Sequence, residues 1–423
     1  MKLGNYEINK RTAVIIVIAV LIGLNVALTV TCIGLFTRDI QRNRLVPINN
    51  VNSGETADPN NELTDAEYVA IGNVIREIEQ IFNSKYVRER GSDYKSRVIN
   101  GYLSGIGDPY AYYYTPEEMQ KNIDEDNGSS YGIGVIVAWT GDSLKIIHVM
   151  KDSPASRAGI IPGDDLKGVN GAVFSDMSYS EALASCRGEK GDEKNFAVER
   201  DGSNIEIKIV CGDYTVESVF TSIKEKNGVK IGVIECTQFI YPTPGEIKAA
   251  VEKVEAEGVK GIVFDMRGNP GGLLDSVVKV LDYLLPEGPV VHLTYKNSAL
   301  NETYSSDAEY ATDLPFVILV SGSTASAGEL FTSCMRDFNR ATIVGTTTFG
   351  KGCGQTQYKL SDGGYIKLTS FFYDPPTSEN YDGEGIVPDV VVELPEEYAN
   401  VNLSLIPEGE DDQMKAALDI LAK

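Results

Sequence analysis

The hydrophobic pattern of the chain begins with one long apolar run. Residues Ala13 to Phe36 carry no charge and are almost wholly apolar. At about 1.5 Å of helix rise per residue, this run can cross a bilayer core of about 30 Å. We therefore expect residues 1–44 to form a cytoplasmic tail and an uncleaved membrane anchor, with a cleaved signal peptide as the alternative. Basic residues flank both ends of the run and do not settle its orientation: Lys10, Arg11, Arg38, Arg42 and Arg44.

A polar stretch and an amphipathic helix follow the apolar run. Residues 45–61 are rich in Pro, Asn, Ser and Gly, which is typical of a linker. Thr64 and Glu67 have the spacing of a capping box, which marks a helix start. The apolar face behind it needs a covering surface, and packing on the core is sufficient. Its residues recur at helical spacing: Ile71, Val74, Ile75, Ile78, Ile81 and Phe82.

The pattern changes near Ser130 to short apolar runs separated by glycine turns. Strands are predicted at Gly132–Val137, Leu144–Val149 and Ile205–Val210, with a short helix at Ser180–Cys186. These elements indicate a small β-rich module, which we place at residues 126–212.

Strands and helices alternate in the third region, residues 213–397. This alternation predicts an α/β fold in which a sheet is layered with helices. Strands are expected at Val229–Glu235, Gly261–Phe264, Phe316–Ser321 and Ala341–Gly345. Helices are expected at Thr243–Glu257, Gly272–Leu285 and Ser326–Phe338. A hairpin turning at residues 361–364 follows, and residues 398–423 contain a C-terminal helix that docks on the core or on a second copy.

Charge and composition exclude several kinds of site. The chain of 423 residues has a net charge of −23, so it lacks the basic field that a nucleic-acid partner requires. His148 and His292 are the only histidines, which leaves little material for a histidine triad or a zinc site. The cysteines show no C-x-x-C spacing, and a Cys186–Cys211 bridge stays open. They are Cys32, Cys186, Cys211, Cys236, Cys334 and Cys353.

Ser326 is the first candidate for chemistry. It ends a turn of small residues that leaves a buried strand, and a helix begins with it. A serine at a helix N-terminus lies beside free N–H groups that favour developing negative charge. The alternative role is that of an ordinary N-cap serine.

Lys351 is the second candidate, since it stands between Gly350 and Gly352. Burial of a lysine disfavours its ammonium form and makes it usable as a base. An exposed turn lysine is the alternative. The segment Gly345–Lys351 also fits a nucleotide-binding loop, but Gly352 stands where that loop needs Ser or Thr, and a strand follows where a helix is required.

The segment Asp265–Leu273 is the third candidate, and it leads from a strand into a helix. Its adjacent glycines free the backbone to point N–H groups at a ligand. One such group and the N–H of Ala327 can together form an oxyanion hole. An ordinary strand-to-helix turn is the alternative.

Taken together, Asp265–Leu273, Ser323–Glu329, Phe349–Gln355 and the closing Gly385–Asp389 resemble the carboxyl-terminal processing, or tail-specific, serine peptidases. The resemblance implies a crotonase-like catalytic core of the ββα type. It assigns Ser326 as nucleophile, Lys351 as general base, Gln355 as the residue that orients the lysine, and Gly272 and Ala327 as the oxyanion hole. It matches Arg336 and Asp337 to a structural charged pair and residues 62–125 to a helical cap that contains Tyr110 and Tyr112–Tyr114. Cys353 and Gly354 depart from the family's usual Thr/Val pair.

The β-rich module resembles a PDZ domain. Tyr131, Gly132, Ile133, Gly134 and Val135 match its carboxylate-binding loop, and the segments Ser153–Ile160 and Pro162–Gly171 match the motifs that follow. Consecutive N–H groups in such a loop can capture a terminal carboxylate while the peptide adds a strand. A strand bend is the alternative reading of the glycines.

The resemblance implies an endopeptidase with a Ser–Lys dyad and no metal or organic cofactor. Its partners would be peptide substrates with apolar free C-termini, a membrane reached through residues 13–36, and a second copy in a homodimer. The family places the catalytic domain outside the cytoplasm. A non-catalytic PDZ scaffold is the alternative function.

Overall fold

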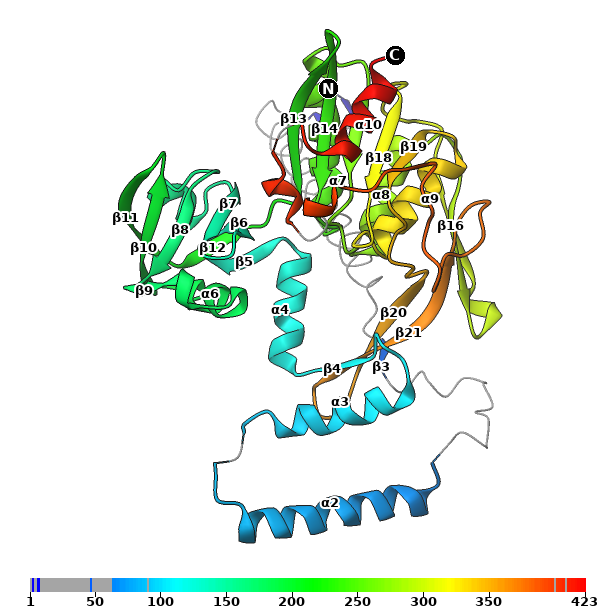
Figure 1. Cartoon of the computed structure of the whole chain (residues 1–423). Helices are drawn as coiled ribbons and strands as arrows, with labels where there is room; N and C mark the ends of the chain where they lie inside the picture. Colours follow the sequence, from blue (N-terminus) through cyan, green and yellow to red (C-terminus); the bar gives the residue numbers. More distant parts are fainter. Residues whose placement is uncertain are drawn as a thin grey trace. The chain divides into compact units, whose positions relative to one another are not determined.

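The computed structural model describes residues 2–3, 6–7, 46–47, 63–89, 91–398, 401–407 and 409–423. The chain divides into two compact units (Figure 1). Unit 1 is Met1–Pro116 with Gln355–Leu368, and unit 2 is Glu117–Gly354 with Thr369–Lys423. The predicted anchor at residues 13–36 lies outside the described residues. Within the described ranges, no helix has the length and apolar character needed to span a membrane.

The described residues of unit 1 include two helices and several short strands. The helices are α2 (Asp65–Lys85) and α3 (Tyr94–Ile106). The strands are β1 (Lys2–Leu3), β2 (Tyr6–Glu7), β3 (Val46–Pro47) and β4 (Tyr112–Tyr114). The predicted capping box is confirmed: the Thr64 N–H donates to Glu67 Oε2 at 2.8 Å, and the Glu67 N–H donates to Thr64 Oγ1 at 3.3 Å.

The apolar face of α2 is exposed among the described residues, and its packing on the core stays a prediction. Helix α2 has no buried residue. Val74 is 55% exposed and Ile81 is 63% exposed. Helical periodicity predicts that one face of a helix is apolar, but it does not predict which surface packs against that face. The homodimer stays a prediction.

Tyr113 anchors β4 within unit 1. Its backbone N–H donates to Asn100 Oδ1 at 2.7 Å, and its hydroxyl donates to Asp362 Oδ2 at 2.9 Å. Lys95 Nζ lies 2.7 Å from the same carboxylate oxygen, and hydrogen bonding to Lys95 lowers the pKa of Asp362 to about 2. Gly364 makes room for the Tyr113 ring. Tyr113 is buried, as expected for the aromatic run, whereas Tyr112 is exposed.

The first part of unit 2 is the β-rich module, whose sheet has the strand order β11-β10-β8-β7-β6, with β9 paired to β8. The strands are β6 (Val135–Trp139), β7 (Leu144–Val149), β8 (Asp165–Val169), β9 (Ala172–Val173), β10 (Glu193–Arg200) and β11 (Ser203–Val210). The helices are α5 (Pro154–Ala158), the 3-10 turn η2 (Phe174–Asp176) and α6 (Tyr179–Cys186). They enclose a separate apolar cluster around Phe174 and Phe196.

The module is bounded by α4 (Pro116–Asp126) and by a two-stranded ribbon of β5 (Ser129–Gly132) and β12 (Gly212–Thr215). The strand predicted at Gly132–Val137 is therefore two strands. Gly132 has φ 143° and Gly134 has φ 76°, and this backbone breaks the strand between β5 and β6.

The second part of unit 2 is built on a six-stranded sheet with the order β13-β14-β15-β18-β19-β22. Its strands are β13 (Val219–Lys226), β14 (Val229–Cys236), β15 (Ile262–Asp265), β18 (Phe316–Val320), β19 (Ala341–Gly345) and β22 (Val390–Val391). β13 is antiparallel to β14, and the other neighbours are parallel. Parallel strands connected by helices are buried on both faces, which explains the continuous apolar run of β18.

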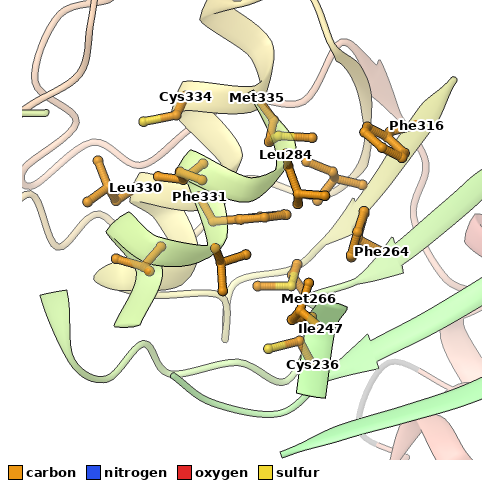
Figure 2. Close-up of a cluster of buried hydrophobic side chains, with 14 of the residues drawn as sticks. Cys236, Ile247, Phe264, Met266, Leu284, Phe316, Leu330, Phe331, Cys334 and Met335 are labelled. Atoms are coloured by element: carbon orange, nitrogen blue, oxygen red, sulfur yellow. The ribbon is translucent and has the colours of Figure 1, made fainter. Parts of the chain in front are cut away.

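Helices cover both faces of this sheet. α7 (Thr243–Ala256), α8 (Leu274–Leu284) and α9 (Ala327–Asp337) enclose the main cluster on one face. Figure 2 shows Phe331 of α9 among Leu284, Phe264 and Met266. On the other face, Ala417 and Leu421 of α10 (Asp412–Leu421) pack with Val317 of β18. The C-terminal helix thus docks on the core of its own chain.

A second sheet follows the order β17-β16-β21-β20-β3. Its strands are β16 (Gly288–Tyr295), β17 (Glu302–Ser306), β20 (Cys353–Lys359) and β21 (Tyr365–Asp374). β16 pairs with the end of β21, where Leu293 lies opposite Tyr373. The predicted hairpin is confirmed. Short 3-10 turns complete the described elements: η3 (Ser298–Leu300), η4 (Glu396–Tyr398) and η5 (Leu403–Leu405).

The described cysteines are all free thiols. The Cys186–Cys211 bridge left open by the sequence is therefore not formed, and Cys32 lies outside the described residues. Both thiols belong to the apolar core of the β-rich module.

Candidate active site

Ser326 occupies a strained turn between β18 and α9. Its backbone has φ 56° and ψ −119°, a combination that costs a non-glycine residue on the order of 1–3 kcal/mol. Such strain persists only where the surrounding structure over-determines it, and it occurs often at functional sites. This strain makes Ser326 a candidate for a functional residue, and its role as nucleophile stays a prediction.

Close packing holds this turn in place. Ser326 is only 5% exposed. A Cβ atom on Gly271 would lie 2.7 Å from the Ser326 Cβ and 2.9 Å from the Ala327 nitrogen, so only glycine fits at that position. The Ala325 N–H donates to the Asn269 carbonyl at 2.9 Å. The third sequence motif is thus brought directly against the first.

Glu329 joins the turn to the lysine loop. Its side chain is fully buried and accepts four hydrogen bonds. The Ser326 N–H and the Lys351 N–H both donate to its Oε2 at 2.8 Å. Thr348 Oγ1 donates to Oε1 at 2.5 Å, and the Gly350 N–H donates to it at 2.7 Å. One carboxylate therefore holds the backbones of Ser326 and Lys351 on the same side of the site.

The lysine loop is also tied to the closing motif of the chain. The Thr348 N–H donates to the Ile386 carbonyl at 3.2 Å, and the Ile386 N–H returns a bond to Thr348 Oγ1 at 2.7 Å. The Phe349 N–H donates to the Thr324 carbonyl at 3.0 Å. After Lys351 the chain enters β20 rather than a helix, which agrees with rejection of the nucleotide-loop interpretation.

Two backbone N–H groups beside Ser326 have no acceptor among the described residues, those of Gly272 and Ala327. The neighbouring Gly271 N–H is occupied, because it donates to Asn269 Oδ1 at 2.8 Å. Ala327 begins α9, where the first N–H groups of a helix lack intrahelical partners. These two donors are the ones that the sequence predicted for an oxyanion hole.

A buried network of ion pairs lies at the end of strand β15, in the segment that leads to Gly271 and Gly272. Arg267 is 3% exposed and binds Asp265 through Nη2 and Oδ2 at 2.6 Å. Its Nη1 lies 2.8 Å from Asp411 Oδ2 and 3.1 Å from Gln413 Oε1, so the start of α10 is bound to the same group. Acceptor oxygens around its N–H groups make a buried guanidinium tolerable.

Cys353 and Gly354 stand where the family usually has a Thr/Val pair, and packing explains the glycine. A Cβ atom on Gly354 would overlap the ring of Phe371 and lie 2.9 Å from Tyr373 Cε1. Glycine at this position makes room for two aromatic rings beside the lysine loop. Burial raises the pKa of the Cys353 thiol to about 11, so this thiol stays protonated at neutral pH.

The remaining predicted residues lie as follows. Gln355 lies on β20 in the segment that belongs to unit 1, and its role stays a prediction. Arg336 and Asp337 do not pair with each other: Arg336 Nη1 donates to the Val387 carbonyl at 3.1 Å, and Asp337 Oδ2 accepts the Thr377 N–H at 2.9 Å. Both have structural partners.

Neither histidine contacts the three motifs within the described part of the chain. His148 Nε2 lies 3.2 Å from Glu235 Oε2, and its ring stacks on Phe220 at 3.6 Å. His292 Nδ1 lies 2.8 Å from Thr303 Oγ1. These partners leave both histidines with structural roles.

The predicted peptide-binding loop lies between β5 and β6. Its Ile133 carbonyl accepts the Ala155 N–H at 2.8 Å, and its Gly134 carbonyl accepts the Met150 N–H at 3.0 Å. Ser153 lies where a side chain on Gly134 would be. The N–H groups of Ile133 and Gly134 have no acceptor among the residues described. Tyr131 is half exposed on β5, and Val135 begins the edge strand β6.

Sequence reasoning missed Glu329, Tyr373 and Gly271 as site residues. Glu329 had a detectable signal, because Ser326 and Glu329 have the spacing of a capping box. Tyr373 lies 47 residues from Ser326, yet its hydroxyl is 3.0 Å from Ser326 Oγ. No local pattern predicts that contact.

Two family models match the chain. The model described as Peptidase family S41 matches residues 230–392, and the model described as PDZ domain matches residues 131–210. A probable CtpA-like serine protease of Staphylococcus aureus (strain N315) is 35% identical over 350 residues, which cover 81% of this chain and 69% of that protein. A probable CtpA-like serine protease of Staphylococcus saprophyticus is 32% identical over 360 residues, covering 82% and 72%.

The chain is also similar to proteins of known structure. The photosystem II D1 C-terminal processing protease is 24% identical, covers 77% of this chain and 89% of its own, and gives a TM-score of 0.46. A putative S41 protease from Bacteroides fragilis is 18% identical, covers 70% of this chain and 82% of its own, and gives a TM-score of 0.49.

The hydrogen bonds of Glu329 generate a stability prediction. We expect Glu329→Gln to lower the free energy of unfolding of the catalytic core by about 3 kcal/mol, because the amide NH₂ would face two N–H donors where a carboxylate oxygen accepts them. Asp337→Asn makes the same chemical change on the same helix at a partly exposed position, and should cost about 1 kcal/mol. Calorimetric unfolding of both variants measures the difference, and equal losses would contradict the role of Glu329.

Proposed function

The chain belongs to peptidase family S41, a family of C-terminal processing serine proteases, and carries a PDZ domain; from this premise we propose that it cleaves peptide bonds through a Ser326–Lys351 dyad. The observation that carries the proposal is the shared carboxylate of Glu329. Its Oε2 accepts the backbone N–H groups of both residues at 2.8 Å. A nucleophile and its base need this kind of fixed relation.

The proposed reaction has two halves. Ser326 Oγ attacks the scissile carbonyl carbon while the neutral amine of Lys351 takes the hydroxyl proton. The tetrahedral intermediate then breaks its C–N bond, and Lys351 donates the proton to the leaving amine. Water attacks the resulting acyl-enzyme with Lys351 again as the base, and Ser326 is regenerated. In this scheme Gln355 orients the lysine amine.

We assign the oxyanion hole to the N–H groups of Gly272 and Ala327. Charge develops on the carbonyl oxygen during attack, and fixed donors in a buried site stabilise that charge strongly. The N–H of Gly271 is occupied, whereas the N–H of Gly272 has no acceptor among the described residues, and this difference supports the choice of Gly272. Ala327 adds the positive end of the α9 dipole.

For substrate selection we propose that the PDZ domain captures an apolar free C-terminus. The N–H groups of Ile133 and Gly134 provide donors for a carboxylate, and Gly132 supplies the backbone turn that exposes them. β6 is the edge strand of its sheet in the described residues, so an extended peptide can pair with it. Trp139 of β6 and Tyr179 of α6 lie 6.0 Å apart and supply apolar surface beside that edge.

Residues 13–36 are proposed to anchor the protein in the cell membrane as a single span, with the catalytic domain outside the cytoplasm. The support is the uncharged apolar sequence of this segment. An N-terminal anchor would leave the PDZ and protease domains on the same side of the membrane.

The dyad makes a specific prediction about side-chain chemistry. We expect Ser326→Ala and Lys351→Ala to lower peptide hydrolysis on the order of a thousandfold or more. Lys351→Arg should be as poor, because a guanidinium cannot act as a neutral base. His148→Ala and His292→Ala are the controls and should hydrolyse the peptide at wild-type rates, with circular dichroism to verify folding. A folded, active Lys351→Arg variant would falsify the dyad. If the wild type and all variants bind the peptide but none hydrolyses it, the result would favour a PDZ scaffold.

Tail recognition predicts a charge-dependent affinity. A substrate peptide whose C-terminal carboxylate is replaced by an amide should be cleaved about ten- to hundredfold more slowly at sub-saturating concentration, because one charge-assisted contact of roughly 1.5–3 kcal/mol is lost. At saturating concentration the two peptides should be cleaved at the same rate, which serves as the internal control. Equal rates at low concentration would remove the tail-recognition claim while leaving the protease claim intact.

Membrane topology can be tested in cells. With the cytoplasmic membrane intact and the outer envelope made permeable, an added protease should digest the catalytic domain while a cytoplasmic marker survives. A variant that lacks residues 13–36 should leave the membrane fraction. A catalytic domain that resists digestion until the cells are lysed would overturn the proposed orientation.

A further inference from the structure

Tyr373 contacts the proposed nucleophile directly. Its hydroxyl oxygen lies 3.0 Å from Ser326 Oγ, within hydrogen-bond distance. Tyr373 is 6% exposed and Ser326 is 5% exposed, so the contact is shielded from water. No sequence motif includes Tyr373, and the dyad mechanism has no role for it.

The surrounding structure fixes the Tyr373 ring rather than leaving it a free rotor. The residue pairs with Leu293 in the sheet, and its N–H donates to the Gly352 carbonyl at 2.9 Å, beside Lys351. Its carbonyl accepts the Asn380 Nδ2 group at 2.9 Å. The ring meets Phe371 edge-to-face at 5.7 Å, in the space that Gly354 leaves open.

We propose that Tyr373 is a third catalytic residue, whose hydroxyl donates a hydrogen bond to Ser326 Oγ during attack on the substrate. This inference rests on the proposed dyad. A serine hydroxyl has one proton and two lone pairs. When its proton passes to Lys351, a lone pair of Oγ remains to accept from Tyr373. Negative charge that develops on Oγ then meets a fixed donor.

The chemistry of a buried phenol supports the direction of this bond. Burial raises the pKa of Tyr373 well above its usual value, so the phenol keeps its proton throughout the neutral range. It therefore does not compete with Lys351 as a base. A donor that is preorganised in a water-excluded site is worth more than the same donor in water.

Tyr373→Phe removes the hydroxyl and keeps the ring packing. We expect kcat to fall about ten- to hundredfold with KM unchanged, because the lost bond acts on developing charge and not on substrate binding. The rate at which a small fluorophosphonate phosphonylates Ser326, with loss of fluoride, should fall by a similar factor, since that step uses the same attack by Oγ. Rates are expressed per labelled serine, so that any unfolded fraction is excluded.

Tyr381→Phe is the matched control. Tyr381 is 5% exposed, and its hydroxyl has no hydrogen-bond partner among the described residues. Removal of this hydroxyl should leave kcat, KM and the phosphonylation rate unchanged. The two variants therefore compare the same chemical change with and without contact to Ser326.

The outcomes separate this inference from the dyad itself. If Ser326→Ala is inactive and unlabelled but Tyr373→Phe matches or exceeds wild type, only the role of Tyr373 is overturned. If Ser326→Ala keeps activity, the proposed Ser326–Lys351 dyad is itself overturned. If Tyr373→Phe does not fold, 3-fluorotyrosine at position 373 provides a stronger donor in the same ring. Its kcat should equal or exceed that of wild type, and a lower kcat would overturn the proposal.

Discussion

The buried carboxylate of Glu329 is the interaction on which the site depends. It stands at the third position of α9 and accepts N–H groups from both the turn before the helix and the loop that carries Lys351. A buried carboxylate is costly unless donors surround it, and here four donors do so. The two chain segments must therefore come together if this charge is to be satisfied.

The strain at Ser326 becomes understandable in the same terms. A positive φ at a non-glycine residue costs free energy, and the core of unit 2 supplies the opposing stabilisation. The apolar face of α9 is buried with Phe331 in the main cluster, so the helix cannot shift to relax the turn. Gly271 lets the neighbouring motif approach the turn closely. The serine is held in a single position that its own backbone preference would not select.

Recognition and chemistry rest on separate apolar cores. The PDZ domain has its own cluster around Phe174 and Phe196, and the catalytic core is built around Phe264 and Phe331. Each domain can therefore keep its loop in shape without help from the other. This division fits the proposed function, in which a substrate is selected by its C-terminus and cleaved at another position.

The sequence alone determined the order of strands and helices, since apolar periodicity and capping residues are local signals. Leu144–Val149 and Ala341–Gly345 form strands with the predicted bounds, and the Thr64–Glu67 capping box begins α2. The motifs also singled out Ser326, Lys351, Gly272 and Ala327, whose catalytic roles remain proposals. The resemblance to tail-specific peptidases, which rests on those motifs, is confirmed at the level of family.

Only the tertiary structure decided which distant residues meet. Tyr373 reaches Ser326 across 47 residues, and Gly354 is small because the rings of Phe371 and Tyr373 fill the space beside it. Such contacts depend on how β21 pairs with β16, which no local pattern specifies. For α2 the apolar pattern was predicted, but that pattern does not specify which surface covers it. Periodicity records which face is apolar, whereas contact between segments depends on the path of the whole chain.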